Sequence, residues 1–464
     1  MVVKPIGQTG FVLLAASALA IVSARSFAGS WNDGSRLATI ESLVDDHTWV
    51  IDRSIFVDVP TADGSSDRSP YPREDANLRL GTSDKVYING HFYSDKPPVP
   101  ALLLAGWYQI LQWTTGLRAR DDPGEFCYWM TVGSSGVAFV AAVWSIFALC
   151  RRLRLDLPSP LLLTASFALS TVALSYSRQV NQHILLLGVA AALLLSLQPL
   201  AGETRASRVP GLRLLAIGTL AGLGYTIDLG AGPVLLACTL GIVLYRCTKL
   251  SAAAYFLLAV IPWVALHHAL IYSIGGAWQP LNTAPESLAW AGSPFDRSNM
   301  TGLWHHQSPL HFIVYAAALL IGKRGFLGHN LPLLLAVATI PAWRRQDEEL
   351  PEVVFAGLFC LTTWLLYAAL SKNYSGAALS IRWFVPMLAP GYFVLAVFLR
   401  DHPHYYIDFL VLSGFGAIIG LLGWFYGPWV KHILPFYWPL QAGALIAWAR
   451  CRRLRERAAP RPHE

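Results

Sequence analysis

Long apolar runs separated by short polar connections dominate the chain. Twelve of these runs approach the ~20 residues that an α-helix needs to cross the hydrocarbon core of a bilayer. We therefore predict an all-α, polytopic integral membrane protein with about 12 transmembrane helices. The predicted spans are residues 9–27, 127–150, 159–177, 183–201, 212–228, 230–246, 252–274, 330–343, 352–370, 384–400, 405–426 and 433–449.

Positive charge alternates from one connection to the next. Arg151, Arg152 and Arg154 follow the second span, and a basic tail, 450–464, follows the last one. Lys and Arg accumulate in the cytoplasmic loops of membrane proteins. We therefore place both termini in the cytoplasm of a bacterial cell, with the chain in its inner (plasma) membrane.

Two further apolar stretches, 97–115 and 309–322, do not fit this alternation as spans. If either one crossed the membrane, the arginine clusters that follow would face outward. We predict that both are helices lying along the outer interface. Segment 10–27 also fits a cleaved signal peptide, but Lys4 is a weak positive flank, so a retained span is favoured.

The polar residues concentrate in two outer loops. The first, 28–126, holds 15 of the 28 acidic residues, and the second, 275–329, is rich in Gly, Pro, His and Trp. Long loops in compact proteins are usually functional or lack structure. The chain is therefore interpreted as one transmembrane domain, 1–464, with loop 28–126 as its catalytic part.

Composition excludes several other classes. The chain is 54% apolar and 14% charged, against roughly 25% charged in soluble domains, so it is not a soluble enzyme. The net charge of +7 forms no basic stripe interleaved with aromatics, so nucleic acid is not expected as a partner. Adjacent His305 and His306 have no carboxylate at helical spacing, and we predict no metal site and no cofactor, although a divalent metal stays open.

A first candidate group follows the first span directly, in Asn32-Asp33-Gly34-Ser35-Arg36. Apolar residues at helical spacing come next, from Leu37 to Val44. A carboxylate such as Asp33 at the boundary between water and membrane can act as a general base. Alternatively, Asp33 caps the start of the helix.

A second group closes the same loop, in Tyr93-Ser94-Asp95-Lys96-Pro97-Pro98. The prolines fix the direction in which the next helix begins, and Lys96 offers a charge suited to a phosphate. The alternative is a lysine that only reaches the head-group level.

Further basic residues lie at predicted outer span boundaries. An arginine near hydrocarbon is costly unless it is paired, and its guanidinium matches the oxygens of a phosphate. These residues could instead only anchor helices at the head-groups, and Asp228 is expected to cap a helix or to form a structural pair. The substrate-binding candidates of this kind are Arg178, His183, Arg324, His329 and Arg382.

Residues 31–115 resemble the first outer loop of GT-C superfamily glycosyltransferases, in the branch of lipid A aminoarabinose transferases and protein O-mannosyltransferases. The likeness rests on Asp33-x-x-Arg36, a tryptophan further on, and Asp95-Lys96-Pro-Pro before an apolar helix. It implies that Asp33 is the catalytic base and that Arg36, Asp95 and Lys96 contact substrate. The chain departs from the family at Gly34, where a second acid is usual, and by an insert at 58–80.

The resemblance implies an inverting transferase that takes a sugar from a polyprenyl-phosphate donor on the outer face of the membrane. Asp33 would deprotonate a lipid, glycan or protein acceptor, and Lys96, Arg178 and Arg382 would stabilise the leaving phosphate. A multi-pass transporter or a lipid or glycolipid flippase is the alternative, and a non-catalytic scaffold is a third. Transporters place their charges near the midplane of the bilayer, whereas the charges here gather on one outer surface.

Overall fold

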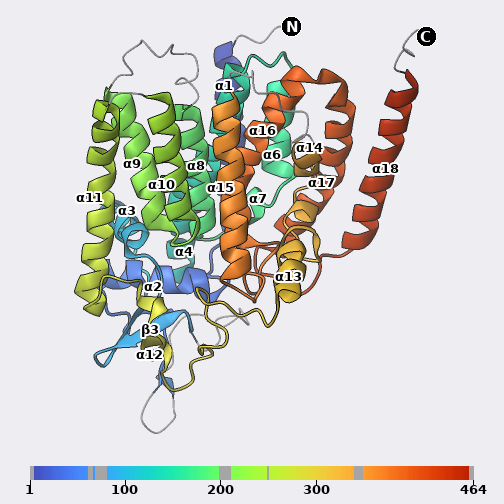
Figure 1. The fold of residues 1–464 in the computed structure, drawn as a ribbon. Helices are drawn as coiled ribbons and strands as arrows, with labels where there is room; N and C mark the ends of the chain where they lie inside the picture. Colours follow the sequence, from blue (N-terminus) through green and yellow to red (C-terminus); the bar gives the residue numbers. More distant parts are fainter. Residues whose placement is uncertain are drawn as a thin grey trace.

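The structure is a computed structural model that describes residues 5–60, 66–67, 81–197, 211–247, 250–338 and 349–458. Its long helices stand side by side in a bundle, as Figure 1 shows. Both ends of the chain lie at one end of this bundle, and the segments of the two long loops lie at the opposite end. We call the latter the loop end.

The first half of the chain supplies several helices at the loop end and much of the bundle. Its helices are α1 (Pro5–Ser23), α2 (Trp31–Asp45), α3 (Pro98–Thr115), α4 (Pro123–Thr131), the π-helix η1 (Val132–Gly136), α5 (Val137–Arg152), α6 (Ser159–Leu169), α7 (Ala173–Tyr176), α8 (Gln182–Leu197) and α9 (Gly211–Ile227). Two short antiparallel pairs join them, β1 (Val59–Pro60) with β2 (Ser66–Asp67) and β3 (Lys85–Ile88) with β4 (His91–Ser94).

The second half completes the bundle. Its elements are α10 (Ala231–Arg246), α11 (Leu250–Gly275), η3 (Leu281–Thr283), α12 (Pro285–Leu288), α13 (Pro309–Ile321), η4 (Leu327–His329), α14 (Leu333–Ala338), α15 (Leu350–Ala369), η6 (Arg382–Met387), α16 (Leu388–Asp401), η7 (Pro403–Tyr405), α17 (Tyr406–Tyr426) and α18 (Tyr437–Ala458).

Each predicted span contains a described helix, but the exact number of twelve crossings is not confirmed. Within the described residues, five helices are long and apolar enough to cross a membrane: Pro123–Arg152, Leu250–Gly275, Leu350–Ala369, Arg382–Asp401 and Pro403–Tyr426. Six shorter apolar helices accompany them. For predicted span 330–343 only α14 is described, because residues 339–348 lie outside the described part. The total of twelve stays a prediction.

One predicted span, 159–177, is divided into α6 and α7. The interruption is stabilised by contacts with other segments. The side chain of Asn330 replaces a helical partner by accepting a hydrogen bond from Val172 N at 3.0 Å, and the side chain of Ser170 donates from Oγ to Ser413 O at 2.8 Å. Because these partners are distant in sequence, the apolar pattern of the span alone did not reveal the break.

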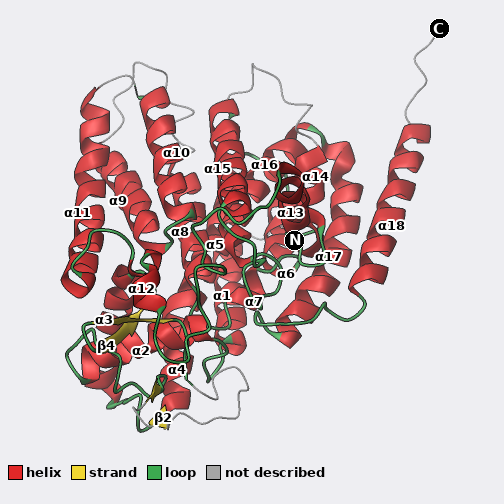
Figure 2. Ribbon diagram, turned by 60° about the horizontal axis from the view of Figure 1, so that its bottom comes forward, coloured by secondary structure: helices red, strands yellow, loops and turns green. Residues whose placement is uncertain are grey.

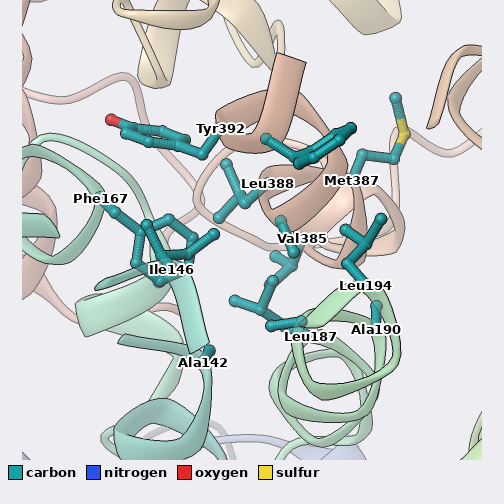
Figure 3. Close-up of a cluster of buried hydrophobic side chains, with 14 of the residues drawn as sticks. Ala142, Ile146, Phe167, Leu187, Ala190, Leu194, Val385, Met387, Leu388 and Tyr392 are labelled. Carbon is teal, nitrogen blue, oxygen red and sulfur yellow. The ribbon is translucent and has the colours of Figure 1, made fainter. Parts of the chain in front are cut away.

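The centre of the bundle is a dry contact among α5, α6, α8 and the η6–α16 segment. Figure 3 shows Ile146, Phe167, Leu187 and Leu388 meeting there. Tyr392 reaches the same region, and its hydroxyl lies 2.9 Å from Ser166 Oγ, which satisfies both polar groups. This packing holds η6 against α8, and the residues at the start of each border the cavity described below.

At the loop end, α2 lies across the helix bundle, and α3 packs against α2 (Figures 1 and 2). The sequence pattern suggested an amphipathic helix here, but α2 is buried on all sides from Asn32 to Ser42. The start of α3 agrees with the prediction, with Pro97 at its N-cap and Pro98 as its first residue. The interfacial positions of α3 and α13 remain predictions.

We expect that the two ends of the bundle face opposite sides of the membrane. In a variant whose native cysteines are replaced by alanine, a cysteine introduced at Arg453 should be protected from a membrane-impermeant thiol reagent in intact cells. A cysteine at Gly292, in the second loop, should react. Labelling of the cysteine at position 453 in intact cells would contradict the predicted topology. As a positive control, the same cysteine should react once the cells are lysed.

Candidate functional site

A cavity of about 370 Å³ lies at the loop end of the bundle. One wall comes from the first loop and the other from the ends of α8, α15 and η6 and the α9–α10 turn, while residues 280–302 of the second loop close it. Its volume is in the usual range of small-molecule sites, roughly 300–1,000 Å³. It is lined by charged residues of both signs.

The wall from the first loop carries two carboxylates joined by one lysine. Lys96 Nζ lies 2.6 Å from Asp84 Oδ2 and 2.8 Å from Asp95 Oδ2. In the β3–β4 hairpin Lys85 is paired with Ser94, so the residues flanking this pair, Asp84 and Asp95, are brought together. Burial raises the pKa of Asp95; Lys96 opposes this shift and Asp84 adds to it.

The opposite wall carries His183, at the start of α8, beside Asp228 in the α9–α10 turn. His183 Nδ1 lies 3.2 Å from Asp228 Oδ2. Asp228 also accepts hydrogen bonds from the backbone amides of Gly230 and Ala231, both at 2.9 Å. The predicted capping role of Asp228 is therefore confirmed, because these amides start α10 and have no helical partner.

Two aromatic rings and an arginine complete this wall. Tyr367 and Trp383 are stacked with their centroids 4.5 Å apart and their planes at 4°. Arg382, next to Trp383, lines the cavity and lies over the ring of Trp429 at 5.6 Å. No carboxylate forms an ion pair with Arg382 in the part of the chain that the structure describes. Its charge is therefore available to an anionic ligand.

Asp33 does not line the cavity. Its carboxylate is fully buried and accepts a hydrogen bond from Gly29 N at 2.7 Å and another from Ser30 Oγ, at the first turn of α2. Burial raises the pKa of Asp33 to about 6, although these hydrogen bonds oppose the shift. Ser30, and not Asp33, is the N-cap of α2, and Asp33, the third residue of the helix, holds Gly29 and Ser30 in place just before it. The predicted base therefore lies away from the cavity and stabilises the start of α2.

Arg36 lies behind the first wall. Its Nη1 donates to Asn32 O at 2.8 Å and to Asn32 Oδ1 at 2.7 Å. Asn32 itself lines the cavity. Arg36 is 2% exposed and its charge interacts favourably with Asp95 and Asp84. It therefore supports the acidic wall from behind.

Three other predicted substrate contacts lie away from the cavity. Arg324 donates to Gly376 O and, from Nη2, to Lys431 O at 3.1 Å, so it joins two loops. His329 donates from Nδ1 to Gly325 O at 2.9 Å and stacks on Tyr437. Arg178 is buried over the ring of Trp424 at 5.1 Å. The sequence placed these three residues at a similar depth in the bundle. A similar depth does not by itself bring side chains into one site.

Four of the predicted contacts, Asp95, Lys96, His183 and Arg382, do line the cavity. Sequence reasoning missed Asp84, Tyr367 and Trp383. Asp84 could have been found from a hairpin prediction, because two short β-prone runs flank Asn89-Gly90 and pair Lys85 with Ser94. The stacking of Tyr367 on Trp383 had no signal in the sequence.

Comparisons with known proteins give structural neighbours only. No family model matches the chain, and no curated protein matches its sequence. The fold is similar to the crystal structure of ArnT from Cupriavidus metallidurans bound to undecaprenyl phosphate, with 14% identity and a TM-score of 0.50. The apo state of the same protein gives 13% identity and a TM-score of 0.51, and each match covers 97% of this chain and 77% of ArnT.

The chain has a GT-C-like fold. The predicted resemblance is confirmed at this level, because ArnT is the lipid A aminoarabinose transferase named by that resemblance. In this GT-C-like fold the matched motif residues Asp95 and Lys96 face the cavity, whereas Asp33 and Arg36 lie behind its wall.

One lysine connects the two outer loops beside the site. Lys85 Nζ lies 4.5 Å from the ring centroid of Phe92 and 4.7 Å from that of Trp290, and it donates to Asp58 O. Burial lowers the pKa of Lys85 to about 8, a shift that Asp58 and Asp52 oppose. Because Trp290 belongs to the second loop, this contact holds that loop over the cavity.

We expect the burial of Asp33 to be visible in the pH dependence of stability. Between about pH 4 and pH 6 the folded protein keeps a proton on Asp33 that the unfolded chain releases, so this group makes the fold less stable as pH rises. The melting temperature of the wild type should therefore fall relative to Asp33→Asn across this range. Thermal unfolding in nanodiscs measures it.

Measuring turnover distinguishes a structural role of Asp33 at the start of α2 from a role as the catalytic base. If the role is structural, Asp33→Asn retains most activity, and so does Ser30→Ala, which alters the same helix start. A loss of ~10²-fold in Asp33→Asn alone, the scale of a missing general base, would restore the catalytic role that the resemblance implies.

Lys85→Met should loosen the second loop. A cation–π contact contributes about 0.5–2 kcal/mol, so limited proteolysis within 275–329 should become roughly 2- to 30-fold faster. Lys372→Met, at an exposed lysine, serves as the control. Equal cleavage of Lys85→Met and wild type would show that the second loop is held by its other contacts.

Proposed function

We propose that the protein is a membrane glycosyltransferase that takes a sugar from a polyprenyl-phosphate donor. The observation that supports this most is the cavity at the loop end of a GT-C-like fold, in which carboxylates face an arginine that has no carboxylate partner among the described residues. A sugar transfer from a lipid phosphate needs a base on one side and a cation for the leaving phosphate on the other.

Arg382 is the proposed phosphate contact. The sequence offered Lys96, Arg178 and Arg382 for this role. Lys96 lies between two carboxylates, and a group of two negative charges and one positive charge does not attract an anion. Arg382 presents a planar guanidinium, which can bind two phosphate oxygens at once. The ArnT structure bound to undecaprenyl phosphate supports a lipid phosphate of this kind as the donor.

Asp95 is the proposed base. Its raised pKa and its position on the cavity wall suit proton transfer from an acceptor hydroxyl or amine. The acceptor oxygen or nitrogen attacks the anomeric carbon with inversion, its proton passes to Asp95, and the bond from that carbon to the phosphate oxygen breaks. The electron pair leaves with the phosphate, so no general acid is needed.

The acceptor in this proposal is a lipid, glycan or protein on the outer face of a bacterial inner membrane. The loop end then faces the periplasm, and membrane lipids surround the bundle. A transporter or flippase is less well supported, because the charged cavity lies at the end of the bundle, where the loops close it, and not within the stack of helices.

Binding of undecaprenyl phosphate to the purified protein in nanodiscs tests the donor. Arg382→Ala should weaken binding roughly 10- to 100-fold, as expected for a lost charged hydrogen bond of about 1.5–3 kcal/mol. Arg382→Lys should recover only part, because a point charge replaces a two-pronged donor. Arg151→Lys and Arg151→Ala are matched controls, because Arg151 is an exposed arginine in the last turn of α5 and does not line the cavity.

Two outcomes would contradict different parts of the proposal. Wild-type affinity in Arg382→Ala would place the phosphate elsewhere, with the buried Arg178 the next candidate. Absence of binding in the wild type would contradict the proposed donor.

Asp95→Asn tests the base. Glycolipids of cells producing wild type or variant should be compared by mass spectrometry against cells without the protein. The product that depends on the wild type should fall ~10²-fold in Asp95→Asn, with the protein still present in the membrane. An unchanged product level would exclude Asp95 as the base.

A further inference from the structure

The bundle-side wall contains a histidine, His183, whose ring nitrogens form no hydrogen bond within the described part of the chain. His183 lines the cavity and is 1% exposed. Its backbone amide donates to Asn181 Oδ1 at 2.8 Å, which fixes the first turn of α8. Neither ring nitrogen has a hydrogen-bond partner among the residues that the structure describes. Buried polar atoms in native proteins are nearly always bonded, so an unbonded imidazole in a cavity wall points to a ligand.

One ring nitrogen, Nδ1, faces a carboxylate that is held rigidly. Besides the two amides at the start of α10, Asp228 accepts from Tyr367 OH at 2.8 Å and from Gln182 Nε2 at 3.0 Å. These donors come from three separate elements and leave the carboxylate no freedom to turn away from His183. Asp228 therefore holds a negative charge at a fixed position beside His183.

The nearby carboxylate favours one of the two positions of the ring proton. A carboxylate 3.2 Å from Nδ1 favours a proton on that nitrogen, which leaves Nε2 of the neutral imidazole with a lone pair. Nε2 then accepts a hydrogen bond and does not donate one. A phosphate at neutral pH offers mainly acceptor oxygens and does not match it, whereas a hydroxyl does.

We propose that His183 is a positioning residue that accepts a hydrogen bond from a hydroxyl of the sugar on the lipid donor, an inference that rests on the proposed function. Arg382, on the same wall, binds the phosphate, and His183 selects the group attached to it. The acceptor substrate approaches Asp95 from the opposite wall. The two walls thus divide recognition between donor and acceptor.

Nanodisc binding of undecaprenyl phosphate, with and without a sugar, tests the proposal. The probes are the bare lipid phosphate and the lipid phosphate carrying glucose, mannose or galactose. The wild type should bind at least one glycosylated lipid about 5- to 10-fold more tightly than the bare lipid, the worth of roughly one hydrogen bond.

Two replacements of His183 distinguish the roles of its two ring nitrogens. In His183→Asn the amide can still face Asp228 but does not reach the Nε2 position, so the preference for the sugar should fall to within about 2-fold of none. In His183→Gln the longer amide reaches that position and should restore part of the preference. Binding of the bare lipid should change less than 2-fold in both. His329→Asn, at a buried histidine away from the cavity, is the matched control and should keep the full preference.

Each other outcome overturns the proposal. These outcomes are a sugar preference retained in His183→Asn, a loss of bare-lipid binding in that variant, or a wild type that prefers none of the glycosylated lipids. Failure of the wild type to bind even the bare lipid would instead remove the proposed function. Thermal unfolding of each variant confirms that the compared proteins are folded.

Discussion

The site depends on charge burial at the loop end of an apolar bundle. Lys96 lies 2.6 Å from Asp84 and 2.8 Å from Asp95 and offsets part of their negative charge, and this contact fastens the β3–β4 hairpin to the start of α3. Removing one member of a buried ion pair leaves an uncompensated charge and costs about 3–5 kcal/mol. The contact therefore defines the position of the loop wall, and everything that the cavity offers on that side follows from it.

The two walls of the cavity differ in chemistry because they come from different parts of the fold. The loop wall is acidic, with its lysine already paired. The bundle wall presents Arg382 and His183, and the central apolar packing of η6 and α16 against α8 sets the relation between these two residues. A rigid apolar core thus positions Arg382 and His183, while the charged loop layer carries the proposed base.

The second outer loop is part of the same site. Residues 280–302 close the cavity, and Trp290 of this segment lies against Lys85, the neighbour of Asp84. The pKa of Lys85 is lowered to about 8 by burial, so holding this charge between two rings is costly, and the ring contacts and the carbonyl of Asp58 offset part of the cost. A change in either loop is therefore felt at the acidic wall.

Local properties of the sequence determined the membrane class, the positions of the apolar helices, the start of α3 at Pro98 and the capping by Asp228. Each of these depends on residues within a few positions of one another, through apolar length, fixed proline dihedrals or an amide at a helix start. Only the tertiary structure decided that Lys96 is shared by Asp84 and Asp95, that Asp33 faces its own helix start, and that Arg324 and His329 bind backbone carbonyls away from the cavity. The strand register and the packing of distant helices set these contacts, because a side chain's partner depends on where the whole chain places neighbouring segments, and residue type and predicted membrane depth do not specify that.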